Sequence, residues 1–186
     1  MVATKSNMVP LGTIAPSFSL LDPRYKKNVS FSMDTKGKGF IIAFICNHCP
    51  FVIHLKEHFT KLFNEFHTNS EINVYAISSN DSLNYPDDAP DKMAIESERL
   101  GLKFPYLFDE DQKVAKSYGA SCTPDFYLFD EHKKLFYRGQ YDDSRPGNAK
   151  KVTGKDISNA VNLMLHRKDS PVNQMPSIGC NIKWKK

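Results

Sequence analysis

The sequence predicts an α/β fold in which helices flank a central mixed β-sheet. Apolar, β-branched runs alternate along the chain with segments whose apolar residues recur every three or four positions. This alternation is typical of strands connected by helices. A predicted strand hairpin and a final long helix complete the pattern. The 186 residues, of which 40% are hydrophobic and 25% charged, are enough for one globular domain with a substantial core.

The first half of the chain contains the strand that we expect at the centre of the sheet. Residues 18–21 and 29–33 are predicted to be short strands, with a turn at 22–24 between them. Residues 39–45 form a continuous apolar run, which indicates a strand buried on both faces. A long helix is predicted from Pro50 onward, because proline is favoured in the first helical turn. Its apolar stripe consists of Val52, Leu55, Phe59, Leu62 and Phe66.

The second half continues the alternation and adds two long connections. The predicted elements are a strand at 72–78, a helix at 89–100, an apolar run at 104–108, a short helix at 112–118, a hairpin of strands 125–130 and 134–138, and a helix at 157–165. Loops as long as 79–90 and 139–154 are usually functional or mobile. We expect residues 1–168 to form the domain, including an N-terminal extension, and residues 169–186 to form a C-terminal tail that packs on it.

Charge and composition argue against two classes of partner. The net charge of +4 is spread in mixed sign along the chain, so the sequence predicts no one-sided basic surface for nucleic acid. The longest apolar run, residues 40–46, is far shorter than the roughly 20 residues needed to cross a bilayer, so we expect no membrane partner. The N-terminal segment shows no apolar signal region, which predicts a cytoplasmic location.

The strongest chemical motif is Cys46-Asn-His-Cys49-Pro50, between the predicted central strand and the long helix. The chain has four cysteines, too few for a disulfide scaffold, and paired cysteines in a reducing compartment are more often catalytic or metal-binding. A helix N-terminus stabilises a thiolate, and the two-residue spacing brings both sulfurs within bonding range. Cys46 and Cys49 are therefore predicted to be catalytic. His48 either supports the thiolate as an imidazolium or is an exposed spacer.

A zinc site is the alternative of a different class. Cys46, Cys49, His54 and His58 follow the spacing C-x2-C-x4-H-x3-H, which offers four zinc ligands. The two histidines, however, lie on the flank of a continuous helix, and cysteines at the start of that helix would have difficulty folding back onto both. We therefore predict no metal and no organic cofactor, because the chemistry resides in the sulfurs.

A second motif, residues 118–125, leads into the predicted strand at 125–130. Pro124 in this motif cannot donate to a strand ladder, and a proline at such a place often follows a cis peptide bond. Proteins of the thioredoxin fold resemble this arrangement, because in them a cis-proline loop faces the cysteine pair and presents backbone to an extended substrate. We favour this interpretation over an ordinary turn, and expect Thr123 and Pro124 to support the active site.

Five segments together resemble a known family. They are IAFICNHCPFV, SNDSLNYPDDAPDKM, YGASCTPDFYLFD, GQYDDSRP and GCNIKWK. They are similar to a peroxiredoxin-like subgroup of the alkyl hydroperoxide reductase/thiol-specific antioxidant (redoxin) family, over nearly the whole chain from Leu11. The resemblance implies a thioredoxin-like fold and an antioxidant or thiol-repair function.

The match to peroxiredoxins is incomplete. Cys49-Pro50 matches their peroxidatic cysteine and the proline after it. Cys46 stands where they carry Thr or Ser, Ile42 where they carry Pro, and Thr123 where they carry Arg. Arg138 or Arg145 is left as a candidate substitute for the missing arginine. The match to thioredoxin implies that Cys46 is the exposed nucleophile and that Cys49, more buried, resolves the mixed disulfide.

Three functional hypotheses follow. The favoured one is a thiol–disulfide oxidoreductase that cycles Cys46 and Cys49 between dithiol and disulfide. The alternatives are a thiol-dependent peroxidase, with Cys49 peroxidatic and Cys46 resolving, and a non-catalytic module that binds zinc or senses redox state. The expected partners are protein or small-molecule disulfides or peroxides, together with a thiol reductant such as thioredoxin. A homodimer is compatible with the resemblance.

Two further cysteines are candidate redox thiols. Cys122 lies two residues before Pro124 and either relays oxidation or is a small core residue. Cys180 lies in the polar tail near Trp184. The resemblance to two-cysteine peroxiredoxins makes it a candidate resolving cysteine. The alternative is that the tail only packs over the fold or a partner, with Trp184 as its anchor.

Overall fold

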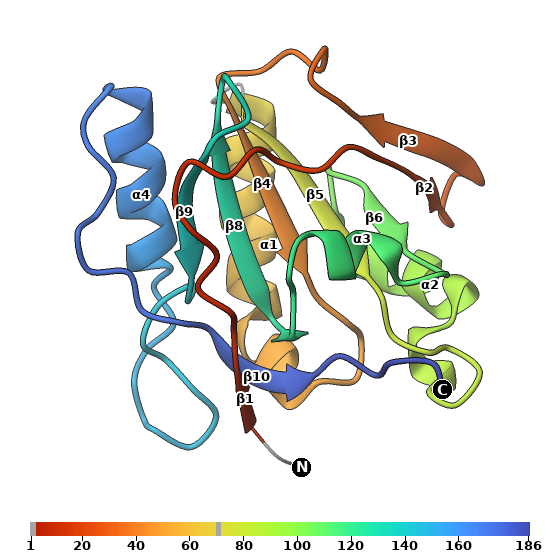
Figure 1. Ribbon diagram of the computed structural model, residues 1–186. Coiled ribbons are helices and arrows are strands. Elements are labelled where there is room, and N and C mark those ends of the chain that lie inside the picture. Colours follow the sequence, from red (N-terminus) through yellow and green to blue (C-terminus); the bar gives the residue numbers. More distant parts are fainter. Residues whose placement is uncertain (1–2, 70–71) are drawn as a thin grey trace.

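The computed structural model describes residues 3–69 and 72–186, which include a seven-stranded mixed sheet with helices on both faces (Figure 1). The strand order is β3-β2-β6-β5-β4-β8-β9. The strands are β2 Phe18–Asp22, β3 Lys27–Phe31, β4 Gly39–Phe44, β5 Ile72–Ser78, β6 Tyr106–Phe108, β8 Asp125–Asp130 and β9 Leu135–Gly139. The helices are α1 Pro50–Asn69, α2 Pro90–Leu100, α3 Lys113–Ser117 and α4 Lys155–Leu165, with a 3-10 turn, η1, at Pro86–Asp88. The predicted fold class is confirmed.

Strand β4 lies at the centre of this sheet, as its apolar run predicts. It pairs with β5 in parallel and with β8 in antiparallel orientation, and all six of its residues are buried. Because side chains alternate along a strand, Phe40, Ile42 and Phe44 enter the core on one face of the sheet. Ile41 and Ala43 enter the core on the other face. The end of β4 is therefore held rigidly from both sides.

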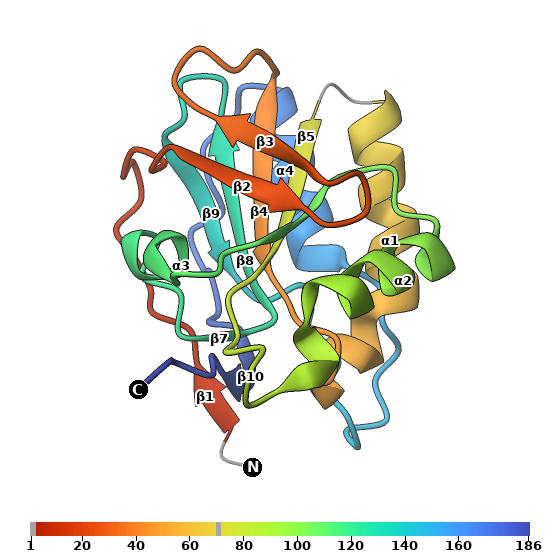
Figure 2. The ribbon, with the colours of Figure 1, turned by 90° about the vertical axis from the view of Figure 1, so that its right-hand side faces the viewer.

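The two faces of the sheet are covered by different helices. Figure 2 shows α3 on the opposite side of the sheet from α1 and α2. Apolar residues of α1, α2 and α4 share one core, which includes Phe59, Met93 and Ile157. Val114 and Ala115 of α3 belong to the other core. Among the helices in the described part of the chain, none is long and apolar enough to span a membrane.

A second, small sheet was not predicted. The described residues form a three-stranded antiparallel sheet in the order β1-β10-β7, from Ala3–Lys5, Ile178–Asn181 and Cys122–Thr123. In Figure 1 it lies below the end of β8, with both chain ends nearby. Strands of two to four residues are too short to show a periodic pattern, and this pairing joins the two ends of the chain to the segment before Pro124.

Candidate active site

The cysteine pair lies where the chain leaves β4 and enters α1. The Ile45 N–H donates to the Ile77 carbonyl over 2.9 Å and continues the pairing beyond β4. The Ile53 N–H donates to the Cys49 carbonyl over 2.9 Å as the first turn of the helix closes. Pro50 is the first residue of α1, where a missing N–H costs no helical hydrogen bond. Cys49 therefore sits immediately before the helix, where backbone N–H groups point at its side chain.

The segment before β8 faces both cysteines. The peptide bond between Thr123 and Pro124 is cis, as the sequence predicts. The Thr123 carbonyl oxygen lies 3.1 Å from the Cys49 sulfur and accepts a hydrogen bond from it when Cys49 is protonated. The Thr123 hydroxyl lies 3.3 Å from the Cys46 sulfur. A single residue on this loop thus contacts both reactive sulfurs.

Exposure does not separate the two cysteines in the way that the thioredoxin match implies. Cys46 is 2% exposed and Cys49 is 0% exposed. The expectation that Cys46 is exposed is wrong, because Cys46 belongs to the core between the sheet and α1 and is covered by its neighbours. The roles of the two thiols are therefore decided by their hydrogen bonds and charges.

Those hydrogen bonds make Cys49 the thiolate of the pair. The Cys46 thiol donates to Cys49, as do the Cys180 thiol and the backbone N–H groups of Val52 and Cys180. These donors outweigh the effect of burial and lower the pKa of Cys49 from about 9 to about 5. The pKa of Cys46 is raised, because its proton is donated to Cys49, because it is buried, and because the Asp88 carboxylate is near. At neutral pH, Cys49 is ionised and Cys46 is protonated.

His48 forms an ion pair that the sequence did not reveal. Its Nδ1 lies 2.7 Å from Oδ2 of Asp88, and its ring stacks on Tyr85 at a centroid distance of 5.6 Å. The Asp88 carboxylate raises the pKa of His48 and so favours the imidazolium. The charge on Cys49 acts in the same direction. His48 is therefore a half-buried partner of Asp88 in which the imidazolium is favoured, rather than an exposed spacer.

Asp88 is the functional residue that sequence reasoning missed. It is 0% exposed, and its two oxygens accept hydrogen bonds of 2.7 Å from the Asn47 backbone N–H and the Asn80 amide. Burial opposes its ionisation, but the contacts with His48, Asn80 and Asn47 outweigh burial and lower its pKa. The length of loop 79–90 was the available signal. Only the turn η1 shows which acidic residue of that loop points inward.

The zinc alternative with His54 and His58 is not supported by the geometry. His54 Nε2 lies 2.7 Å from the Ser144 hydroxyl, and His58 Nδ1 lies 2.7 Å from the Tyr141 hydroxyl. Both rings therefore contact the loop after β9 rather than the cysteines. Among the residues that the structure describes, one group offers three metal-ligand atoms within 4.8 Å of one another: Cys46, His48 and Asp88. In that group His48 and Asp88 are already bonded to each other.

The two candidate arginines are used elsewhere. Arg138 donates to the Val9 carbonyl and to Gln174, and Arg145 donates to carbonyls of its own loop and to Gln140. Neither guanidinium group is directed at the cysteines. His48, in contrast, interacts with Cys49, because the charge on Cys49 raises the pKa of His48.

Cys122 and Cys180 have different surroundings. Cys122 is fully buried, its thiol lies 3.7 Å from the Pro124 carbonyl, and burial raises its pKa. This environment favours the interpretation of Cys122 as a small core residue. Cys180 lies in β10 and contacts Cys49. The tail is anchored by Ile182, which is 1% exposed, and not by Trp184, which is 39% exposed.

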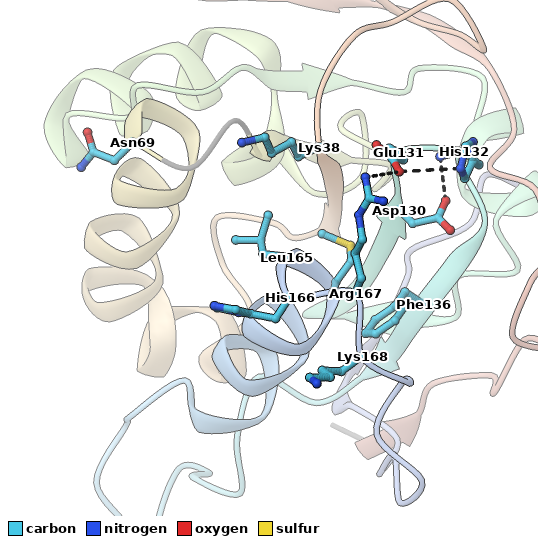
Figure 3. Close-up of a pocket in the computed structure, with 11 residues that line it drawn as sticks. Lys38, Asn69, Asp130, Glu131, His132, Phe136, Leu165, His166, Arg167 and Lys168 are labelled. Carbon is cyan, nitrogen blue, oxygen red and sulfur yellow. Dashed lines mark hydrogen bonds and ion pairs between the residues drawn. The ribbon is translucent and has the colours of Figure 1, made fainter.

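A hollow lies at the other end of the sheet. Figure 3 shows a cavity of about 850 Å³ beside the C-terminal end of α4, with Arg167 directed toward Glu131. Its lining includes Lys38, from the segment before β4, and Asn69, from the last turn of α1. No cysteine contributes to that lining.

The fold and the site define the class: a thioredoxin-fold protein that holds a dithiol opposite a cis-proline. The chain belongs to the AhpC/TSA family, whose model matches residues 11–138. This finding confirms the family resemblance of the sequence motifs. Fold and family together make the chain a redox protein of the thioredoxin-like type.

Two solved structures match almost the whole chain. An uncharacterized conserved protein from Geobacillus kaustophilus is 48% identical, with coverage of 100% of this chain and 97% of that chain and a TM-score of 0.95. A hypothetical protein from Sinorhizobium meliloti is 43% identical, with 98% coverage of both chains and a TM-score of 0.94. A putative thioredoxin from Neisseria meningitidis shares the fold, at 22% identity, 84% and 93% coverage and a TM-score of 0.62. No curated protein matches the chain.

Proposed function

We propose that the protein is a dithiol oxidoreductase in which Cys49 attacks the substrate and Cys46 resolves the product. The observation that carries this proposal is the polarisation of the pair: the Cys46 thiol donates to Cys49, whose pKa is lowered to about 5. Thiolates are the nucleophiles of disulfide exchange, so the ionised sulfur attacks first. This order is the reverse of the one that the thioredoxin match implies.

The reaction has two balanced steps. The Cys49 thiolate attacks a disulfide R–S–S–R′, the substrate S–S bond breaks, and R′–S⁻ leaves as the Cys49–S–S–R bond forms. Cys46 then attacks the sulfur of Cys49, expels R–S⁻ and transfers its proton to that leaving group. The product is the Cys46–Cys49 disulfide, and two thiols of a reductant return it to the dithiol.

The neighbouring residues assist these steps. The His48 imidazolium, oriented by Asp88 at 2.7 Å, stabilises negative charge on sulfur and is placed to exchange a proton with a leaving thiolate. The Thr123 hydroxyl contacts the Cys46 sulfur, and the Thr123 carbonyl contacts Cys49 while that sulfur carries a proton. Pro50 begins the helix whose N–H groups stabilise Cys49, and Pro124 directly follows Thr123 in the loop that faces the cysteines.

The substrate and reductant classes are part of the proposal. The substrates are protein or small-molecule disulfides, and the electrons come from a thiol reductant such as thioredoxin. The reaction serves antioxidant or thiol-repair work in the cytoplasm. The AhpC/TSA match and the small number of cysteines support this assignment.

A second candidate is favoured by the same thiolate. Hydroperoxide reduction by Cys49, with Cys46 resolving the sulfenic acid, needs an ionised sulfur and a site that admits a small oxidant. The lowered pKa of Cys49 fits the first requirement, and its complete burial disfavours bulky oxidants more than small ones. Against this candidate, the guanidinium groups of Arg138 and Arg145 are hydrogen-bonded elsewhere. His48 is then the remaining candidate for the positive group that polarises the O–O bond.

One experiment tests both candidates. The reduced protein is mixed with one equivalent of glutathione disulfide or of hydrogen peroxide, quenched in acid and alkylated, and disulfides are mapped by mass spectrometry. We expect the Cys46–Cys49 disulfide to form with glutathione disulfide much faster than a free thiol reacts. A faster reaction with hydrogen peroxide would favour the peroxidase instead. Failure of both oxidants to produce this disulfide would overturn both candidates, and Cys122→Ser is the control that must react as the wild type does.

A further inference from the structure

The C-terminal strand brings a third cysteine to the reactive pair. In the pairing of β10 with β7, Cys180 lies opposite Thr123, the residue that contacts both sulfurs. The Cys180 thiol donates a hydrogen bond to Cys49, and the backbone N–H of Cys180 does the same. Cys49 is therefore flanked by two thiols, one from its own motif and one from the tail.

Gly179 allows the tail to approach this closely. A side chain at position 179 would collide with the carbonyl group of Thr123, and it would also press against Pro124. The backbone of β10 thus lies directly against the loop that faces the cysteines. Any larger residue at this position would move β10, and Cys180 with it, away from Cys49.

The rest of the tail fixes Cys180 in place. The Ile182 N–H donates to the Ser121 carbonyl over 3.1 Å, and its side chain is buried. The Lys183 N–H donates to the Asn80 amide oxygen over 2.8 Å, and its carbonyl accepts from the Asp81 N–H over 2.9 Å. A thiol held beside a sulfur in this way reacts with it as an intramolecular partner, without loss of translational freedom.

Burial and the neighbouring Cys49 thiolate keep Cys180 protonated. Burial and the hydrogen bond to Cys49 raise the pKa of Cys180 to about 12. Oxidation of Cys49 removes its negative charge, and with that charge goes one cause of the raised pKa. The tail thiol thus becomes a better nucleophile once Cys49 has reacted.

We propose that Cys180 is a third redox thiol of this site, which forms a disulfide with oxidised Cys49. This inference rests on the proposed function, because Cys49 must first react with a disulfide or a hydroperoxide. From Cys49–S–S–R, the Cys180 sulfur bonds to Cys49 and R–SH leaves with the Cys180 proton. From the sulfenic acid, the leaving product is water. In this sequence of steps Cys180, rather than R–S⁻, is the leaving group when Cys46 attacks Cys49: Cys46 gives its proton to Cys180 and forms the Cys46–Cys49 disulfide.

Removal of Cys46 should trap this intermediate. The full-length Cys46→Ser variant is reduced, treated with one equivalent of glutathione disulfide, quenched in acid, alkylated and digested with trypsin. Cys49 then lies in the peptide 39–56, Cys122 in 117–133 and Cys180 in 169–183. A Cys49–Cys180 disulfide therefore joins two peptides, whereas a Cys46–Cys49 disulfide in the wild type stays within one peptide.

We expect the joined peptides 39–56 and 169–183 as the main product of Cys46→Ser. Cys49 found as its glutathione adduct, with Cys180 alkylated, would overturn the proposal. The wild type is analysed in parallel, because its Cys46–Cys49 disulfide tests the proposed function. If the wild type forms that disulfide and Cys46→Ser forms no Cys49–Cys180 link, only the role of Cys180 fails.

Two further variants control for proximity. Adding Cys122→Ser to Cys46→Ser must leave the joined peptides unchanged, since Cys122 donates to Pro124 and not to Cys49. Adding Gly179→Ala keeps all three remaining thiols but displaces β10, so the joined peptides should decrease strongly. Circular dichroism checks that this variant is folded. An undiminished yield in the folded Gly179→Ala variant would contradict the role assigned to the strand.

Discussion

The two ends of the central sheet differ in a way that shows where chemistry is possible in this protein. At one end, beside the C-terminal end of α4, lies a cavity of about 850 Å³ with Arg167 and Glu131 in its wall. At the other end, the cavity next to Cys46 measures only about 10 Å³. Exposed charged side chains border the larger cavity. The end with the small cavity instead holds buried thiols and the ion pair of His48 with Asp88.

The difference indicates that charges and hydrogen bonds, rather than cavity size, distinguish the end where we propose that the reaction occurs. Arg167 and Glu131 are 3.7 Å apart, with side chains 86% and 50% exposed, so water screens their charges. His48 and Asp88 are 2.7 Å apart, and the Asp88 side chain has no exposure. Water is largely excluded there, so each charge acts strongly on its neighbours and shifts their pKa values. The following predictions test this contrast.

The largest effect is expected from Cys49→Ser. At pH 6 a thiol with a pKa of about 5 is mostly ionised, whereas an ordinary thiol is ionised to less than about 1%. The rate of alkylation by iodoacetamide at pH 6 should therefore be about 100-fold lower in the variant than in the wild type. In the wild type this rate should be level above pH 6 and should decrease as the pH falls through 5. A wild-type rate that rises steadily up to pH 9 would contradict an acidic Cys49.

The tail anchor should be the next most sensitive position. Ile182→Ala removes a buried side chain of the core and should reduce the free energy of unfolding by about 2–4 kcal/mol. Loosening the tail should also speed the reaction of the buried thiols with a bulky maleimide. Trp184→Ala is the matched control, because Trp184 is 39% exposed. Equal effects of the two substitutions in urea unfolding would show that Ile182 is not the anchor.

Asp88→Asn should have a smaller effect that depends on pH. Loss of the buried carboxylate should cost about 2 kcal/mol of unfolding free energy and should lower the pKa of His48. The raised pKa of His48 stabilises the fold below pH 6.5, and this stabilisation is lost as the pH rises through the folded-state value. The lowered pKa of Asp88 stabilises the fold above pH 3.8, and this is lost as the pH falls through its folded-state value.

The difference between wild type and Asp88→Asn should therefore be largest between about pH 4 and 6.5. Urea unfolding across this range, together with NMR titration of His48, measures both effects. Asp87→Asn is the matched control, because Asp87 is exposed and only its backbone carbonyl contacts the site, through Asn47. A pKa of His48 that is unchanged in Asp88→Asn would refute the ion pair.

The cavity end should respond least. Arg167→Gln removes one partner of an exposed pair and should change the free energy of unfolding by less than about 0.5 kcal/mol. It should leave the alkylation rate of Cys49 at pH 6 unchanged, since nothing joins Arg167 to the thiols. A decrease in that rate would break the contrast between the two ends.

Much of this structure could be predicted because it is periodic or local. The run in β4 and the stripe of α1 fix the sheet centre and the helix behind it, and their junction positions Cys46, Cys49 and Pro50. Some predicted boundaries shifted: the strand expected at 29–33 spans Lys27–Phe31, and a turn follows it, in which the Ser32 N–H donates to the Thr35 hydroxyl. The cis bond before Pro124 also followed from local sequence.

The chain by itself therefore determined the mixed sheet, the dithiol at a helix N-terminus and the proline loop opposite it. Only the tertiary structure decided which sulfur is the thiolate. The donors to Cys49 include Cys46 of the same motif and Cys180, which is far away in the sequence. It also selected Asp88 from an acidic loop and brought β10 to Thr123. The physical reason is that pKa values depend on neighbours in space, and neighbours from distant segments follow no sequence period.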